Sequence, residues 1–157
     1  MNIKDIDQLD PKNTLLDNLP VDMLEAIYEA QRRLMQKYKG LEENHFEKIF
    51  GVKGTIPDKV WAGDKSNVHT KAGNHFIVEN INATIHELSE ATQVLKNWKS
   101  WKQTEVEADA DHYREEMIDA LHFFMEAFVL SGITPKEIYE TYLKKNKVNQ
   151  ARQRTNY

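Results

Sequence analysis

The sequence predicts an all-α fold, a bundle of about four main helices. Apolar residues recur at the helical spacing of 3.6 residues in four long segments. No segment shows the sustained alternation of apolar and polar residues that is typical of a half-buried strand. Residues that cap helices also stand at several segment ends. The 157 residues have the size of one domain, and we expect an N-terminal arm over residues 1–17 and the all-α domain over residues 18–157.

The first two helices are predicted from their apolar periodicity. The first is expected over residues 20–39, with Gly40 as its stop. Residues 51–73 are rich in glycine and have no sustained period, so we expect a long loop there. The second helix is expected over residues 75–98. The residues expected to face inward are Ile77, Ile81, Ile85, Leu88, Ala91, Val94 and Leu95.

Capping residues predict the other two helices. After a polar break over residues 99–108, Asp109 or Asp111 can cap a third helix that reaches Leu130, where Ser131 and Gly132 end it. The sequence Thr-Pro-Lys-Glu over residues 134–137 is a helix start, with an N-cap threonine, proline in the first position and glutamate in the third. We expect this fourth helix to continue to about residue 146.

Composition excludes several classes of protein. No apolar run approaches the roughly 18–20 residues that span a bilayer, and the N-terminus lacks the pattern of a signal peptide. The absence of cysteine excludes disulfides and thiolate metal sites. A net charge of −4 does not favour binding to long nucleic acid. We therefore expect a soluble cytoplasmic protein without a membrane or nucleic-acid partner.

Two acidic pairs are the main functional signal. Glu87 and Glu90 are three residues apart, as are Glu116 and Asp119, so each pair lies on one face of its predicted helix. One such pair is usually a solvated surface, but apolar residues surround both pairs here. Four carboxylates brought together repel one another. Mg²⁺, or Mn²⁺ as a substitute, takes oxygen ligands and resolves that conflict.

Two other readings of these pairs stay open. A di-iron bundle needs a Glu-x-x-His motif on two helices. The chain offers Asp119 with His122, but Glu90 takes the place of the second histidine. The other reading is a non-catalytic helical interaction protein with a vestigial acidic site. His122 is expected to support the site or lie in the core, and His86 is expected to be incidental.

Two further stretches carry a family resemblance. Residues 95–99 read Leu-Lys-Asn-Trp-Lys, and the tail from Tyr142 to Tyr157 has the pattern Tyr-x-x-Lys-Asn-x-x-Asn-x-x-Arg-Gln-x-x-Asn-Tyr. Together with the acidic pairs and the Leu-His-Phe run after Asp119, they resemble the all-α nucleoside triphosphate pyrophosphohydrolases (MazG-like), and among these the dimeric dUTPase-like branch. That branch closes with glycine where this chain has Asn156.

The resemblance implies an activity and a set of site residues. The activity is Mg²⁺-dependent hydrolysis of a deoxypyrimidine nucleoside triphosphate, dUTP first, to the monophosphate and pyrophosphate. The four acidic residues would hold the metal and orient water. A homodimer or higher homo-oligomer is also implied, and it would complete the bundle. The residues implied in substrate binding are Trp98 against the base, Lys99, Lys145 and Arg152 on the phosphates, and Asn149 and Tyr157 as hydrogen-bonding partners. A place in the core is the alternative for Trp98.

The resemblance also bears on the remaining basic tail residues and on the residues of the first helix that would contact the base. Among the basic tail residues, Lys144, Lys147 and Arg154 are expected to be solvated. Gln31 matches a glutamine that the branch places against the pyrimidine. Leu34 and Met35 stand where the branch has an asparagine. Hydrolysis of dCTP, or of both dCTP and dUTP, is therefore the alternative.

Overall fold

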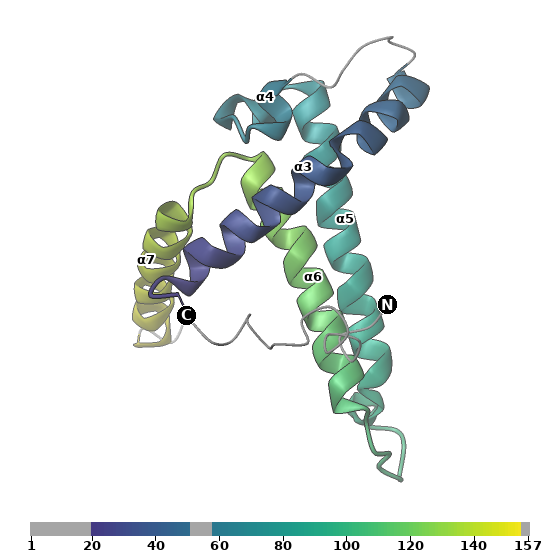
Figure 1. The fold of residues 1–157 in the computed structure, drawn as a ribbon. Helices are drawn as coiled ribbons and strands as arrows, with labels where there is room; N and C mark the ends of the chain where they lie inside the picture. The colour runs from purple at the N-terminus through teal and green to yellow at the C-terminus, as the bar shows by residue number, and fades with distance from the viewer. Residues whose placement is uncertain (1–19, 51–57, 155–157) are drawn as a thin grey trace.

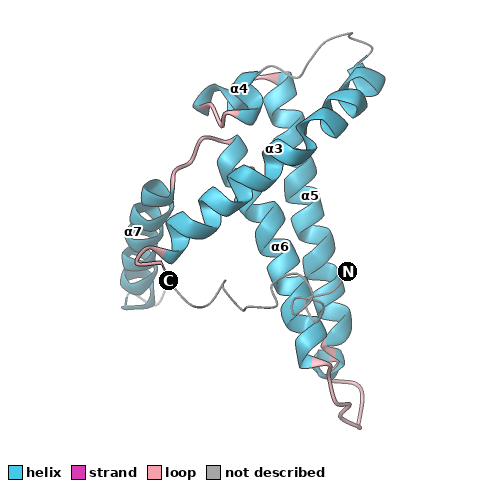
Figure 2. Cartoon of the chain, in the orientation of Figure 1, coloured by secondary structure: helices cyan, strands magenta, loops and turns pink. Residues whose placement is uncertain are grey.

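The computed structural model describes residues 20–50 and 58–154, and every regular element in these two ranges is a helix (Figure 2). The predicted all-α fold with four main helices is confirmed. The predicted arm and Tyr157 lie outside the described residues. The long helices are α3 (Met23–Phe50), α5 (Lys71–Val94), α6 (Ala110–Leu130) and α7 (Pro135–Arg154). Short helical turns are α4 (Asp58–Trp61), η2 (Lys65–His69) and η3 (Lys96–Trp98).

A pair of adjacent helices forms the axis of the molecule. α5 and α6 lie side by side along most of their length, and α3 crosses them and packs against α6 (Figure 1). α7 lies apart from this pair, beside the first part of α3. The core lies near the crossing, at the α4 end of the molecule. Its buried residues are Tyr28, Met35, Val60, Trp61, Phe76, Met125, Val129 and Leu130.

Asn67 joins three elements at the end of the core. Its side chain is buried, and Nδ2 donates to the carbonyl of Val60 at 3.0 Å and to that of Leu130 at 2.7 Å. η2 comes very close to α5 here, since a Cβ on Gly73 would lie only 2.3 Å from the Asn67 carbonyl oxygen. A glycine is therefore required at residue 73 for this packing.

The predicted starts of the last two helices are confirmed. Asp109 Oδ1 accepts from the backbone N–H groups of Asp111 at 3.1 Å and His112 at 3.0 Å, which caps α6. At α7, Thr134 N–H donates to Glu137 Oε2 at 2.9 Å, and Glu137 N–H donates back to Thr134 Oγ1 at 3.3 Å. α7 continues to Arg154, beyond the expected end near residue 146.

Two expected boundaries are wrong. Gly40 does not end α3, which continues to Phe50; a single glycine costs a helix interior only about 1 kcal/mol relative to alanine. The loop expected over residues 51–73 contains α4, η2 and the start of α5. Side-chain caps define these short elements, because Asp64 Oδ1 accepts from Ser66 N–H at 2.7 Å and Thr70 Oγ1 accepts from Gly73 N–H at 3.1 Å.

The inward face expected for α5 is largely wrong. Ala91 is buried, and Ile77 and Val94 are half-buried. The other expected residues are exposed, with Ile85 at 59%. Helical periodicity identifies an apolar face of a helix but does not indicate what covers that face. In this single chain, α6 packs against the adjacent face of α5, where Phe76, Asn80 and Ala91 are buried. The exposed members of the set are Ile81, Ile85, Leu88 and Leu95.

The described helices are too short or too polar to cross a membrane one at a time. Only α6 and α7 taken together, with a bend of 106° between them, have the length and composition to do so.

Candidate active site

Three carboxylates from two helices meet on the α5–α6 pair. Glu87 of α5 and Glu116 and Asp119 of α6 each place one oxygen within 4.8 Å of the others. The spacing of three residues puts Glu116 and Asp119 on one face of α6, and the side-by-side packing of α5 and α6 brings Glu87 to them. We refer to these three residues as the acidic group.

The acidic group concentrates negative charge in a partly dehydrated place. Glu116 is buried, and its Oε1 lies 2.7 Å from Nε2 of His112. Burial raises the pKa of the Glu87 carboxyl, and the charges of Glu90, Asp119 and Glu116 raise it further. Carboxylate oxygens at this spacing are the donors that hard divalent cations prefer. The residues present therefore fit Mg²⁺ or Mn²⁺.

Glu90 lies next to the acidic group but does not belong to it. It stands one helical turn after Glu87, and its Oε1 lies 3.3 Å from Nε2 of His86. It lines a neighbouring hollow together with Glu107 and His112. The structure thus brings three of the four predicted ligands together, while the charge of the fourth is close enough to raise the pKa of Glu87.

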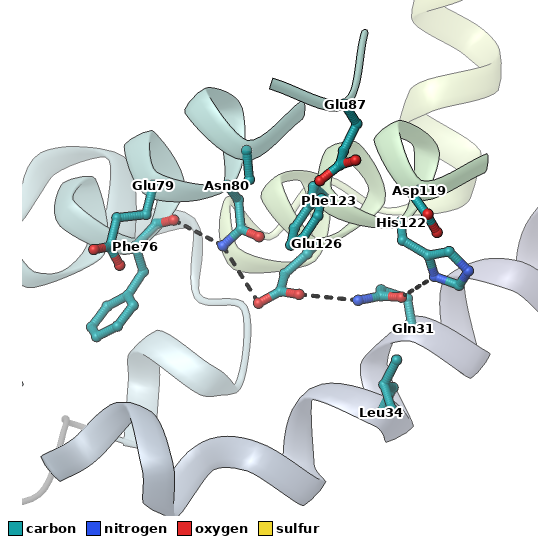
Figure 3. Close-up of a pocket in the computed structure, with 11 residues that line it drawn as sticks. Gln31, Leu34, Phe76, Glu79, Asn80, Glu87, Asp119, His122, Phe123 and Glu126 are labelled. Atoms are coloured by element: carbon teal, nitrogen blue, oxygen red, sulfur yellow. Dashed lines mark hydrogen bonds between the residues drawn. The ribbon is translucent and has the colours of Figure 1, made fainter. Parts of the chain in front are cut away.

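A pocket of about 750 Å³ adjoins the acidic group between α3, α5 and α6. This volume lies within the usual range for small-molecule sites. Glu87 and Asp119 belong to its wall, so a ligand in the pocket would touch the acidic group (Figure 3). The other lining residues are Gln31, Leu34, Phe76, Glu79, Asn80, Ala83, His122, Phe123 and Glu126.

Buried polar side chains from all three helices are connected in the wall of this pocket. Gln31 of α3 donates from Nε2 to Oε2 of Glu126 at 3.0 Å, and its Oε1 lies 2.8 Å from Nδ1 of His122. Asn80 of α5 donates from Nδ2 to the carbonyl of Phe76 at 3.0 Å and, at 3.4 Å, to Oε1 of Glu126. Figure 3 shows these contacts as one continuous network. It combines Gln31, which the sequence predicted, with residues that it did not.

Asn80 and Glu126 are the site residues that sequence reasoning missed. A usable signal existed for Glu126, because it is the one charge in the apolar run over residues 123–130. An unpaired charge in such a run is costly, and apolar neighbours were likewise the signal for the two acidic pairs. Asn80 had a weaker signal, a polar residue between Ile77 and Ile81.

Trp98 and Lys99 lie outside the pocket. Both residues follow α5, and Trp98 is exposed. The centroid of the Trp98 ring lies 5.7 Å from that of Trp101 and 5.7 Å from Nζ of Lys99. Asn97 closes this turn by pairing with the backbone of Val106 through two hydrogen bonds of 2.9 Å. The structure does not bring this segment to the acidic group.

The basic tail also lies elsewhere. Lys145, Asn149 and Arg152 are exposed on α7, which stands apart from the α5–α6 pair in Figure 1. Lys145 lines a separate, mainly apolar cavity with Phe124 and Phe128. Within one copy of the chain, the predicted phosphate-binding residues and the predicted metal ligands are therefore not assembled.

The sequence is similar to known enzymes that act on deoxynucleoside triphosphates. The sequence model of the dUTPase family matches residues 23–131, well over half of the chain. Relatives include the dCTP pyrophosphatases of Enterobacteria phage LZ5 and Enterobacteria phage T4, each 34% identical over 71 residues. These residues cover 38% of this chain and 41% and 42% of the two relatives, so the chain spans about two fifths of the curated relatives it matches. No solved structure matches the chain significantly.

Proposed function

The chain belongs to the dUTPase family, and on this premise we propose that it hydrolyses a deoxypyrimidine nucleoside triphosphate, dUTP or dCTP, to the monophosphate and pyrophosphate. One observation carries the proposal: the acidic group forms part of the wall of a pocket large enough for a nucleoside. A nucleotide in this pocket could place its phosphates at the acidic group and its base between α3 and α6.

We propose Mg²⁺ as the cofactor, with Mn²⁺ as a substitute. Glu87, Glu116 and Asp119 would hold the ion, and Glu90, one helical turn after Glu87, would join them. Bound there, the metal would polarise the phosphoryl oxygens and stabilise the pyrophosphate leaving group. His112 holds Glu116 through a 2.7 Å contact and so fixes the orientation of that carboxylate.

The pocket supplies the nucleoside part of the site. Phe76, Phe123 and Leu34 line it with apolar surface against which a flat base can pack. The polar network provides the hydrogen-bonding groups, among them Gln31. The carboxylates and the base pocket thus lie along one continuous surface, as the two ends of a deoxynucleotide require.

We further propose that a second copy of the chain completes the site. Phosphates need cations, but among the described residues that line the pocket there is no lysine or arginine. Lys145 and Arg152 stand on α7, exposed and distant from the acidic group of the same copy. The exposed apolar row on α5 gives a second copy a surface on which to pack.

The proposal is tested by incubating the full chain with Mg²⁺ and each deoxynucleoside triphosphate and measuring both products. We expect monophosphate and pyrophosphate from dUTP or dCTP. Glu116→Gln should lower kcat at least about 100-fold, because it removes a ligand charge at the acidic group. Glu115→Gln is the matched control, since it removes the same charge one residue away from the acidic group and should leave turnover intact.

Glu90→Gln separates the fourth predicted ligand from the other three. We expect lost turnover with an unchanged far-ultraviolet circular dichroism spectrum, because the variant keeps the shape of the side chain. Normal turnover would restrict the metal site to the acidic group. Absence of pyrophosphate release from every deoxynucleotide would refute the enzyme and favour a helical interaction protein.

A further inference from the structure

Three of the five buried polar or charged side chains among the described residues serve the pocket rather than the core. Asn67 ties helices together and Glu116 belongs to the acidic group. The remaining three, Gln31, Asn80 and Glu126, come from three different helices and meet at one wall of the pocket. Burying the Glu126 carboxylate there is costly unless it accepts hydrogen bonds. Its neighbours must therefore turn their donor atoms toward it, and this determines which atoms of the network donate and which accept.

The Glu126 carboxylate fixes the orientation of Asn80. The amide nitrogen of Asn80 lies between two acceptors, the Phe76 carbonyl and Glu126 Oε1. Only the NH₂ group can face two acceptors. The Asn80 Oδ1 atom therefore points the other way, toward the side of the pocket where Glu87 lies (Figure 3).

The same carboxylate fixes the proton of His122 through Gln31. Because Gln31 Nε2 donates to Glu126 Oε2, its Oε1 faces His122 Nδ1 at 2.8 Å. An amide oxygen can only accept, so Nδ1 of His122 must carry the hydrogen. In the neutral ring Nε2 is then an acceptor.

The pocket therefore presents acceptors and few donors to a base. The nitrogens of both amides are directed to Glu126, and Glu79, Glu87 and Asp119 add carboxylates to the wall. A base with an exocyclic amino group brings two N–H bonds on one nitrogen to such a wall. Uracil instead brings a single N–H between two carbonyl oxygens, and these oxygens would face acceptors.

We propose that Glu126 is a positioning residue that makes this pocket select cytosine over uracil. It acts by holding Asn80 and Gln31, and through Gln31 the tautomer of His122, in the arrangement that accepts hydrogen bonds from the cytosine amino group. The inference rests on the proposed function and deepens it by naming the base. A site whose polar groups match one base rejects a base that leaves them unpaired.

The test compares binding of the α,β-imido analogues of dCTP and dUTP, which resist cleavage, in the presence of Mg²⁺. We expect the wild-type chain to bind the dCTP analogue at least about tenfold more tightly. Glu126→Gln should bring this ratio close to one, because Gln31 and Asn80 donate to two different oxygens of Glu126 and a glutamine replaces one of these oxygens with an NH₂ donor. Glu115→Gln is the matched control: it removes a charge from the same helix, α6, but from neither the pocket wall nor the network, and the ratio should persist.

A second measurement does not depend on any variant. ¹⁵N nuclear magnetic resonance of the wild-type histidines should show that Nδ1 of His122 carries a proton. A ring without a proton on Nδ1 would overturn the inference. So would a wild-type preference for the dUTP analogue, or an equal loss of preference in Glu115→Gln.

Hydrolysis assays separate the two proposals. Turnover of deoxypyrimidine triphosphates without a preference for dCTP overturns the role of Glu126 and leaves the proposed function standing. Absence of turnover with either triphosphate overturns the function itself.

Discussion

Asn67 links α4, η2 and α6 at the α4 end of the molecule. It is almost fully buried, and its amide satisfies two backbone carbonyls. Asn67→Ala should lower the free energy of unfolding by roughly 2–3 kcal/mol, because the carbonyls of Val60 and Leu130 each lose a buried hydrogen bond. Among the described residues, Val60 then keeps only the hydrogen bond from Gly63 N–H. Urea unfolding measures the change. Asn74→Ala is the control: Asn74 is exposed and donates to the Asn67 carbonyl, so we expect a loss below about 1 kcal/mol. Equal losses would contradict the assigned role.

Individual residues also show what the sequence could predict of the site. Glu87, Glu116 and Asp119 were identifiable because spacing and apolar neighbours are both readable along a chain. Glu126 and Asn80 were not identified, because their role depends on which atoms of α3 and α5 face them. Such pairings arise from the crossing of helices and have no local sequence pattern.

The start of α7 is held by charges and caps that depend on pH. Glu137 accepts a hydrogen bond from Lys65 and two from Thr134. The Lys65 hydrogen bond and those of Thr134 lower the pKa of Glu137 from 4.5 to about 2. A lowered pKa in the folded state stabilises the fold at pH values above 4.5, and this contribution is lost as the pH falls toward 2.

Glu137→Gln should therefore lower the Tm at neutral pH, and the difference from wild type should disappear as the pH approaches 2. Differential scanning calorimetry between pH 7 and pH 2 measures both effects. Glu140→Gln, on the same helix, is the control, because Glu140 has only a 3.8 Å contact with Lys136. A Tm difference that stays constant with pH would contradict the role of the Glu137 charge.

Capping residues predicted the ends of the helices better than glycines did. The caps at Asp109 and Thr134 are local hydrogen bonds between residues two to three apart. Both partners therefore lie within one short stretch of sequence, where the pattern can be recognised. Gly40 has only a small unfavourable propensity, which the rest of a long helix outweighs. The short elements between residues 58 and 70 were missed because they lack the length needed for a periodic pattern.

The whole chain exposes an apolar row on α5 that a self-sufficient monomer would cover. Ile81, Ile85 and Leu88 lie one to two turns apart on one face and are 40–59% exposed. We expect the chain to be a dimer in light scattering after gel filtration. Ile85→Glu should weaken the dimer at least about tenfold, because burying an unpaired charge costs well over 1.4 kcal/mol.

Val68→Glu is the control for the dimer prediction, because Val68 is similarly exposed but lies on η2. It should leave the dimer intact. A wild-type chain that is monomeric at the concentrations used for activity would contradict the prediction. Periodicity identified the apolar row, but we predicted it to lie in the interior, because periodicity does not distinguish a core from a surface that a second chain covers.

Helix α6 sets the distance between two parts of the candidate site. It carries Asp119 at the acidic group and Glu126 behind the base pocket, seven residues apart. At 1.5 Å per residue this is about 10 Å along a rigid rod, and seven residues are close to two whole turns. One residue inserted between them would lengthen the rod by about 1.5 Å and rotate one end by about 100°. The chain can therefore exchange side chains along this stretch more easily than it can change its length.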